Sequence, residues 1–482
     1  MLVLLLVGLA LRLLVLRSRL GDLNADEAYT GLQSLGVIRD GRFPVVIDGA
    51  NYSAVLEAYF FAPVVTLLGG SVAGLKLLFI CIWAAAAAVT AGAARRLLDG
   101  RAALVAGAIV WLAPGALMVL STRAYVCYAL GMTVVAGVVW TTAIVADQAT
   151  PRVLSSALVG GLAGLAFYIH PIYITVLVPT VAVAAVVHWR EWRTWWLPAV
   201  AAAVVANIPF IAWNALNGWP SLKSQYFPPG TAAGRFEGFI TGLLPRAFGL
   251  RSFNGEWIFG RTIGLVLYAV LVAGVVAGCV FMVRGSRRPS RWIVPVVLTT
   301  CLPAMALFPH LVYVADGRYG IVPFAFVAIA LGGAASHLVG LLPRPQATLM
   351  LGAVITLWAV VTVVPFLRNE KGFERFDANA WQERVIDRLD RAGIDRVAGN
   401  YWLALPIEYR SDRSIRVAVA GDPYVVRFPG SQRIVEQTPA EQVAFLFPPG
   451  DQPPQLFRLP LDRYRREDLG GVILYLPPAA RS

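Results

Sequence analysis

The sequence predicts a polytopic α-helical membrane protein with about eleven transmembrane helices and a small extracytoplasmic α/β domain at its C-terminus. The first observation is composition: 58% of the 482 residues are hydrophobic, 14% are charged, and the mean hydropathy is +0.66. This is more apolar surface than a soluble globular protein carries. The second observation is that long apolar runs fill residues 1–366, whereas charge rises from residue 367 onward.

The apolar runs define the predicted transmembrane helices. A helix that crosses a bilayer needs roughly 20 mainly apolar residues. Runs that meet this criterion lie at residues 2–20, 71–94, 102–120, 124–146, 153–169, 171–188, 195–215, 259–283, 292–313, 319–341 and 347–366. Two long segments between these runs, 21–70 and 216–258, are predicted outer loops of one transmembrane domain, residues 1–366.

Short basic loops orient these helices. If the N-terminus is cytoplasmic, every short inside loop contains arginine: Arg95, Arg96 and Arg101, then Arg152, Arg190 and Arg193, the run 284–291, and Arg344. This distribution satisfies the positive-inside rule. It also explains the net charge of +13 without a nucleic-acid partner, because the arginines form no basic face. The long outer segments and the C-terminal domain are then extracytoplasmic, and the arginine-rich, lysine-poor composition suggests a bacterial plasma membrane.

Residues 367–482 have the pattern of a soluble α/β domain. The stretch "WQERVIDRLDRAG" has helical periodicity, and "RSIRVAVAG" and "GGVILYLP" are typical of strands. The stretch "GIDRVAGNYWLALPIEYRSD" predicts a strand, a loop and a second helix. No catalytic signature is present in this domain, so a structural or acceptor-recruiting role is expected.

Two adjacent carboxylates, Asp26 and Glu27, follow the first apolar run. A charged pair in a loop is most often solvated. Here, however, the following residues alternate between apolar and polar, which favours segments that lie in the membrane interface. The pair is therefore expected at the edge of a protein-lined cavity, where a lipid-linked polar substrate is accessible.

Four local motifs together resemble the GT-C superfamily of membrane glycosyltransferases. These are "ADEAYTG" in the first outer loop, "STRAYVCYAL" at 121–130, "YIHPIY" around His170 and "DGRYGIVPF" at 316–324. Within this superfamily the chain is most similar to relatives of the protein O-mannosyltransferases and the aminoarabinose lipid A transferases. The resemblance covers about residues 1–366.

The resemblance implies transfer of a sugar from a polyprenyl phosphate to an acceptor hydroxyl, with inversion, at the outer face of the membrane. The acceptor is a glycan, glycolipid or protein, and membrane lipids surround the site. A weak hydroxyl nucleophile needs a carboxylate to accept its proton, and Asp26 is the candidate base. Glu27 is expected to orient the acceptor, brace the loop or help a metal. The sequence requires no cofactor and leaves a divalent cation open.

The leaving lipid phosphate needs cationic and hydrogen-bonding donors. The candidates are Arg318 and Tyr319, Arg123 and Tyr125, His170, Arg246 and Arg251. Each has a structural alternative: a turn-fixing ion pair for Arg318, interface anchoring for Arg123 and Tyr125, a buried structural histidine for His170, and an ordinary interface loop for Arg246 and Arg251.

Acceptor or sugar binding is assigned to side chains with aromatic faces or hydrogen-bonding groups near the outer rim. The candidates are Glu57, Trp219, Tyr226 and His310. Scattered histidines and cysteines make no zinc motif.

Two other functions remain open. A transporter of lipid or small polar solute would require internal repeats and mid-membrane charges. No repeat is evident, and the charges within predicted spans are few; they include Arg12 and Lys76. A non-catalytic scaffold for envelope assembly would have the same pattern of spans.

Overall fold

The computed structural model describes residues 2–68, 71–223, 231–284, 286–307, 317–421, 425–450 and 463–478. The chain divides into two compact units. Unit 1 comprises Met1–Val15, Phe79–Thr122 and Cys127–Phe373. Unit 2 comprises Leu16–Leu78, Arg123–Val126 and Glu374–Ser482.

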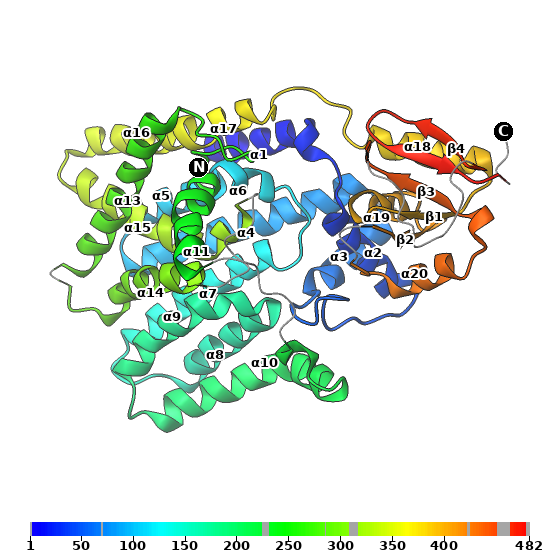
Figure 1. Ribbon diagram of the computed structural model, residues 1–482. Helices are drawn as coiled ribbons and strands as arrows, with labels where there is room; N and C mark the ends of the chain where they lie inside the picture. Colours follow the sequence, from blue (N-terminus) through cyan, green and yellow to red (C-terminus); the bar gives the residue numbers. More distant parts are fainter. Residues whose placement is uncertain are drawn as a thin grey trace. The chain divides into compact units, whose positions relative to one another are not determined.

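Unit 1 is built from apolar helices (Figure 1). The longer ones are α1 (Leu2–Leu16), α4 (Val72–Leu97, whose first residues belong to unit 2), α5 (Gly100–Trp111), α7 (Tyr128–Ala146), α8 (Val153–Ile169), α9 (Ile174–Val187), α10 (Leu197–Leu216), α13 (Arg261–Val283), α14 (Ile293–Leu307), α15 (Ile321–Gly340) and α16 (Arg344–Thr362). Shorter ones are α6 (Gly115–Leu120), η2 (Pro171–Tyr173), η3 (Trp192–Trp196), η4 (Pro220–Leu222), α11 (Ala232–Gly238), η5 (Phe239–Leu243), α12 (Leu244–Ala247), η6 (Pro289–Trp292), η8 (Arg318–Gly320) and α17 (Val364–Asn369).

Seven helical segments of the described residues are long and apolar enough to cross a membrane. They are Val72–Leu97, Tyr128–Ala146, Trp192–Leu216, Arg261–Val283, Pro289–Leu307, Arg318–Gly340 and Arg344–Asn369. Five shorter apolar helices are Leu2–Leu16, Leu56–Leu68, Gly100–Trp111, Val153–Ile169 and Pro171–Val187. The predicted membrane-protein class is thus supported, whereas the number of eleven spans stays a prediction.

One predicted span is interrupted. The run 102–120 contains two helices, because α5 ends at Trp111 and α6 begins at Gly115. Pro114 lies between them and has no backbone N–H to continue the first helix. Gly115 follows it with φ +42°, a conformation that glycine adopts without a steric penalty. The apolar composition alone gives no sign of this break.

Close approach of small residues holds helices of unit 1 together. Helix α8 packs along α10, and a Cβ built at Gly160 would lie 1.9 Å from the carbonyl oxygen of Ala199. Lipid tails are as apolar as the helices, so no hydrophobic force drives helices together inside a membrane. Close contacts between small residues are the usual way for such helices to pack.

The charged residue inside α1 is enclosed by unit 1. Arg12 is fully buried, and its Nη1 and Nη2 donate to the carbonyl oxygens of Gly8 and Trp111, each at 2.9 Å. Its guanidinium also lies over the Trp111 ring, 4.1 Å from the centroid. These contacts give Arg12 a structural role.

Unit 2 joins the first predicted outer loop to the C-terminal region. The loop forms η1 (Arg19–Gly21), α2 (Ala25–Arg39) and α3 (Leu56–Leu68). The C-terminal helices are α18 (Ala380–Ala392), α19 (Tyr401–Arg410), α20 (Pro429–Glu436) and η9 (Ala440–Gln442). The strands are β1 (Arg396–Gly399), β2 (Arg416–Val419), β3 (Ala444–Phe447), β4 (Arg465–Asp468) and β5 (Ile473–Leu476). Helix α2 packs against both α3 and α19 within this unit.

The five strands form one mixed sheet in the order β2-β1-β3-β5-β4 (Figure 1). Strand β1 is parallel to β2 and β3, whereas β5 is antiparallel to β3 and β4. Val435 of α20 packs in a buried cluster with Ala398, Ala418 and Phe445. The predicted helix in 381–393 and the predicted strands in 393–421 and 470–477 are confirmed as α18, β1, β2 and β5.

Candidate active site

The acidic pair begins α2 instead of lying in an open loop. Asn24 is the N-cap: its side-chain oxygen accepts from the Glu27 N–H at 3.0 Å, and the Glu27 carboxylate accepts from the Asn24 N–H at 3.3 Å. This reciprocal capping box fixes the start of the helix. Since successive helical residues point about 100° apart, Asp26 and Glu27 face different surroundings.

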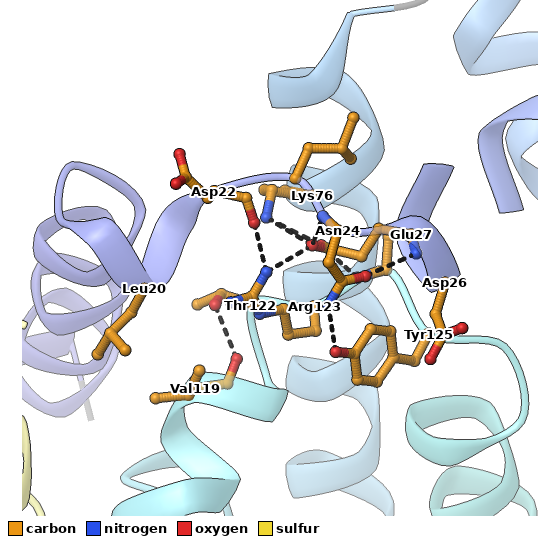
Figure 2. A network of polar contacts seen from close by, with 12 residues as sticks. Leu20, Asp22, Asn24, Asp26, Glu27, Lys76, Val119, Thr122, Arg123 and Tyr125 are labelled. Atoms are coloured by element: carbon orange, nitrogen blue, oxygen red, sulfur yellow. Dashed lines mark hydrogen bonds and ion pairs between the residues drawn. The ribbon is translucent and has the colours of Figure 1, made fainter. Parts of the chain in front are cut away.

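Glu27 is the centre of a buried ionic network (Figure 2). Its side chain is completely buried, and Lys76 Nζ donates to both carboxylate oxygens, at 2.9 and 3.1 Å. Arg123 Nη1 donates at 2.7 Å, and the Ala124 N–H donates at 2.9 Å. A buried carboxylate is tolerated only when paired and hydrogen-bonded in this way.

The network keeps Glu27 charged. Burial acts to raise the pKa of Glu27, but the charges of Lys76 and Arg123 and their hydrogen bonds outweigh it, so the pKa lies below its usual value. Burial acts to lower the pKa of Arg123, but the charge of Glu27 holds it above the usual value. Of the three roles that the sequence left open for Glu27, these contacts favour bracing.

The segment that carries Arg123 and Tyr125 is held against the start of α2 (Figure 2). Arg123 also donates to the carbonyl oxygen of Asp22, and Asn24 Nδ2 donates to the Tyr125 hydroxyl. Thr30 Oγ1 donates to the carbonyl oxygen of Ala124 at 2.7 Å. Both predicted phosphate ligands of this segment thus contact α2 or the residues just before it.

Asp26 is half-buried and is contacted by the C-terminal region. The hydroxyl of Tyr401, the first residue of α19, donates to Asp26 Oδ1 at 2.7 Å. Burial and the negative charge of Asp26 raise the pKa of Tyr401, so the phenol stays protonated and remains a donor. Sequence reasoning missed Tyr401, because nothing local links residues 375 positions apart.

A cavity of about 460 Å³ lies beside the buried network in unit 2. Its wall contains two cationic side chains, Lys76 and Arg410, together with Ser71 and Asn379. Arg410 also pairs with Glu383. Cationic and hydrogen-bonding groups of this kind suit a phosphate or another anionic head group.

Unit 1 contains the other predicted phosphate ligands. Arg318 and Tyr319 form η8, which packs against α12, the helix that carries Arg246. The Arg318 guanidinium lies over the Tyr319 ring at 5.6 Å, and that ring meets Tyr128 edge-on at 6.0 Å. Arg246 Nε donates to the carbonyl oxygen of Ser252 at 2.9 Å. Arg318, Tyr319 and Arg246 therefore come from adjoining segments.

The remaining candidates have separate surroundings. Arg251 lies over the Trp257 ring at 4.7 Å. His170 Nδ1 accepts from the Ile172 N–H at 3.0 Å, so His170 caps η2. Trp219 is half-exposed in unit 1, and Glu57 is buried in the first turn of α3 in unit 2. Tyr226 and His310 lie outside the described residues. Among the residues described, no group of three or more His, Cys, Asp or Glu side chains is arranged to hold a metal ion.

No family model and no curated protein matches the sequence. The structure, however, is similar to solved structures. ArnT from Cupriavidus metallidurans in the apo state has a TM-score of 0.65 and 12% identity, covering 100% of this chain and 98% of that protein. The same protein bound to undecaprenyl phosphate has a TM-score of 0.62 and 11% identity, with coverage of 100% and 99%.

A second similar structure is the archaeal oligosaccharyltransferase AglB from Archaeoglobus fulgidus, in complex with an inhibitory peptide and a dolichol-phosphate. It has a TM-score of 0.52 and 12% identity, covering 93% of this chain and 69% of that protein. ArnT and AglB are both GT-C glycosyltransferases. The chain therefore has a GT-C fold, and the resemblance predicted from the sequence is confirmed at the level of fold.

Proposed function

We propose that the protein is an inverting glycosyltransferase that moves a sugar from a polyprenyl-phosphate donor to an acceptor hydroxyl at the outer face of the membrane. The proposed setting is cell-envelope glycan or glycolipid synthesis in a bacterial plasma membrane, with residues 1–366 as the transmembrane domain and 367–482 as an extracytoplasmic domain. The likeness of the whole chain to ArnT, which was solved with undecaprenyl phosphate, supports a lipid-phosphate donor.

The contact between Asp26 and Tyr401 is the observation that carries this proposal. A half-buried carboxylate at the start of a fixed helix, with one oxygen held by a phenol, is oriented in the way a general base requires. The adjacent Glu27 network holds the backbone of α2 at this point. Asp26 is thus the proposed base, Tyr401 its positioning residue and Glu27 its brace.

The proposed reaction is a single displacement at the anomeric carbon. The acceptor oxygen forms the new bond to that carbon while its proton passes to Asp26. The bond from the anomeric carbon to the phosphate oxygen breaks, and the polyprenyl phosphate leaves with the electron pair. Arg318, Tyr319 and Arg246 are proposed to stabilise that phosphate, because cations and phenols at the leaving oxygen lower the barrier.

Acceptor and sugar contacts are proposed for Glu57 and Trp219. A buried carboxylate in the first turn of α3 is suited to accept from hydroxyls, and a half-exposed indole is suited to stack on a sugar face. No cofactor is needed for the displacement. Activity after treatment with EDTA and after adding back Mg²⁺ or Mn²⁺ would test the role of a divalent cation.

Transfer by purified protein in nanodiscs tests the proposal. The protein is offered a panel of polyprenyl-phosphate sugars with an acceptor mixture from bacterial envelopes, and donor consumption is followed by mass spectrometry. Asp26→Asn is expected to lower the transfer rate by about 10²-fold or more, the range for loss of a general base. The exposed Asp387→Asn on α18 is the matched control. If every donor is left intact, or if Asp26→Asn turns over normally, the proposal is wrong.

A further inference from the structure

A second polar cavity of about 430 Å³ lies within unit 2, away from the residues assigned above. Four arginines line it: Arg42, Arg413, Arg416 and Arg433. We call this cavity the arginine pocket. Its other lining groups include the Phe428 ring, the Ser431 side chain and the Asp40 carboxylate.

A buried aromatic ring holds two of these arginines. The guanidinium groups of Arg42 and Arg413 lie over the Phe428 ring, 5.4 and 5.5 Å from its centroid. Phe428 is buried, with an exposed fraction of 4%. Stacking on a fixed ring leaves the edges of a guanidinium available as hydrogen-bond donors, and these edges match the geometry of phosphate and carboxylate.

The arginines of the pocket outnumber the carboxylates that contact them. Asp40 accepts from Arg413 at 2.6 Å, and Asp48 lies 3.9 Å from Arg42. Glu408 lies 3.5 Å from Arg416 and 3.9 Å from Arg413. These acids contact three of the four arginines.

The fourth arginine, Arg433, has no carboxylate partner among the described residues. Its Nε donates to the carbonyl oxygen of Pro429 in the same helix. Arg433 is also exposed, so a ligand can reach it from solvent.

Glu408, which contacts Arg413 and Arg416, is completely buried. Ser431 Oγ donates to it at 2.5 Å and the Val417 N–H at 3.1 Å. Burial raises the pKa of Glu408 above its usual value. Four arginines and three contacting carboxylates give the pocket a surplus of positive charge.

We propose that the arginine pocket binds a phosphate or carboxylate group attached to a sugar. The volume lies within the usual range for small-molecule sites, which is larger than a single inorganic anion needs. The identification of this sugar as part of the acceptor rests on the proposed function. In that role, the pocket gives the C-terminal region a part in choosing an anionic acceptor.

Binding to the full-length protein in nanodiscs tests this inference by microscale thermophoresis. The probes are glucose 6-phosphate, glucuronate, inorganic phosphate and glucose. We expect glucose 6-phosphate or glucuronate to bind at least tenfold more tightly than glucose, and more tightly than inorganic phosphate. The first two probes distinguish a phosphate from a carboxylate as the recognised group.

The variants are Arg416→Gln/Arg433→Gln and, because Arg433 is exposed, Arg433→Gln alone. The double variant is expected to weaken binding of the anionic sugar at least tenfold and the single variant about threefold. The exposed Arg391→Gln, whose side chain donates to a carbonyl oxygen of its own helix, is the control and is expected to bind normally. Equal binding by glucose, or unchanged binding by both pocket variants, would overturn the inference.

These measurements need no donor, so they separate the two proposals. Asp26→Asn is expected to bind the anionic sugar like the wild type while failing to transfer. Transfer by the wild type together with no binding that depends on Arg416 and Arg433 would reject the arginine pocket alone. Specific binding together with no transfer from any donor would reject the proposed function and leave the pocket as an anionic-sugar site.

Discussion

Replacing the central carboxylate of the buried network is expected to destabilise unit 2 strongly. Glu27→Gln keeps the shape of the side chain but leaves Lys76 and Arg123 without their shared anion. Removing one partner of a buried ion pair typically costs about 3–5 kcal/mol, because the remaining charge stays buried. Glu27 serves two cations, so the upper half of this range is expected, with an apparent melting temperature roughly 10 °C lower.

Intrinsic fluorescence during heating of the detergent-solubilised protein measures this change. Asp26→Asn, one position away, is the control: it weakens the half-buried hydrogen bond from Tyr401, and a loss of about 1 kcal/mol is expected. The double variant Glu27→Gln/Lys76→Met removes one surplus cation together with the anion. The double variant is expected to recover part of the lost stability, because the stability changes caused by mutating residues in contact are not additive.

The two neighbouring variants therefore separate the roles of the pair. Glu27→Gln is expected to unfold early, whereas Asp26→Asn is expected to fold normally and fail to transfer. The reasoning is refuted if Glu27→Gln is as stable as the wild type, or if Asp26→Asn is destabilised as much as Glu27→Gln.

Three further predictions concern unit 2. Tyr401→Phe should lower transfer about tenfold with a stability loss of about 1 kcal/mol, measured by the same assays; unchanged transfer would contradict the positioning role. Gly31→Ala should cost about 1–3 kcal/mol, because its Cβ would lie 2.2 Å from the Tyr409 ring, whereas Gly36→Ala, with its nearest neighbour at 3.9 Å, should be tolerated. The pKa of Glu27 is lowered in the folded state, so the stability that its charge contributes is fully present above about pH 4.5. This contribution is lost as the pH falls further, and the melting temperatures of the wild type and Glu27→Gln should converge at low pH.

Composition and apolar run length predicted the helical framework because lipid imposes a length on each helix. Each of the eleven predicted runs contains helix in the described residues. The break before Gly115 was missed, although Pro114 is visible in the sequence, since proline is also tolerated inside apolar helices such as α9 and α14.

Strands of the sheet were predicted only where residues with high strand propensity alternate or cluster in the sequence. Strands β1, β2 and β5 have the expected branched residues, whereas β4 reads "RRED". This charged sequence has low strand propensity. Strand β4 lies at the edge of the sheet, where charged side chains can stay exposed, so the sheet tolerates it there.

The surroundings of the candidate residues could be predicted in part. The position of Asp26 and Glu27 directly after an apolar run indicated a role at the membrane boundary. The pattern "NADE" is also a readable capping box, and it would have assigned Glu27 to the helix start from the sequence alone. Lys76 and Tyr401, by contrast, lie 49 and 375 positions from their partners, so only the tertiary structure brings them there.

The charged groups around the acidic pair give its two members different surroundings. Glu27 is the carboxylate that both Lys76 and Arg123 contact, and Asp22 interacts electrostatically with the same two cations. Removing or protonating Glu27 would leave these buried cations without their shared anion. A general base must gain and lose a proton in every cycle, which Glu27 could not do without leaving two buried cations unpaired. Asp26 is therefore the proposed base, and Glu27 the proposed brace.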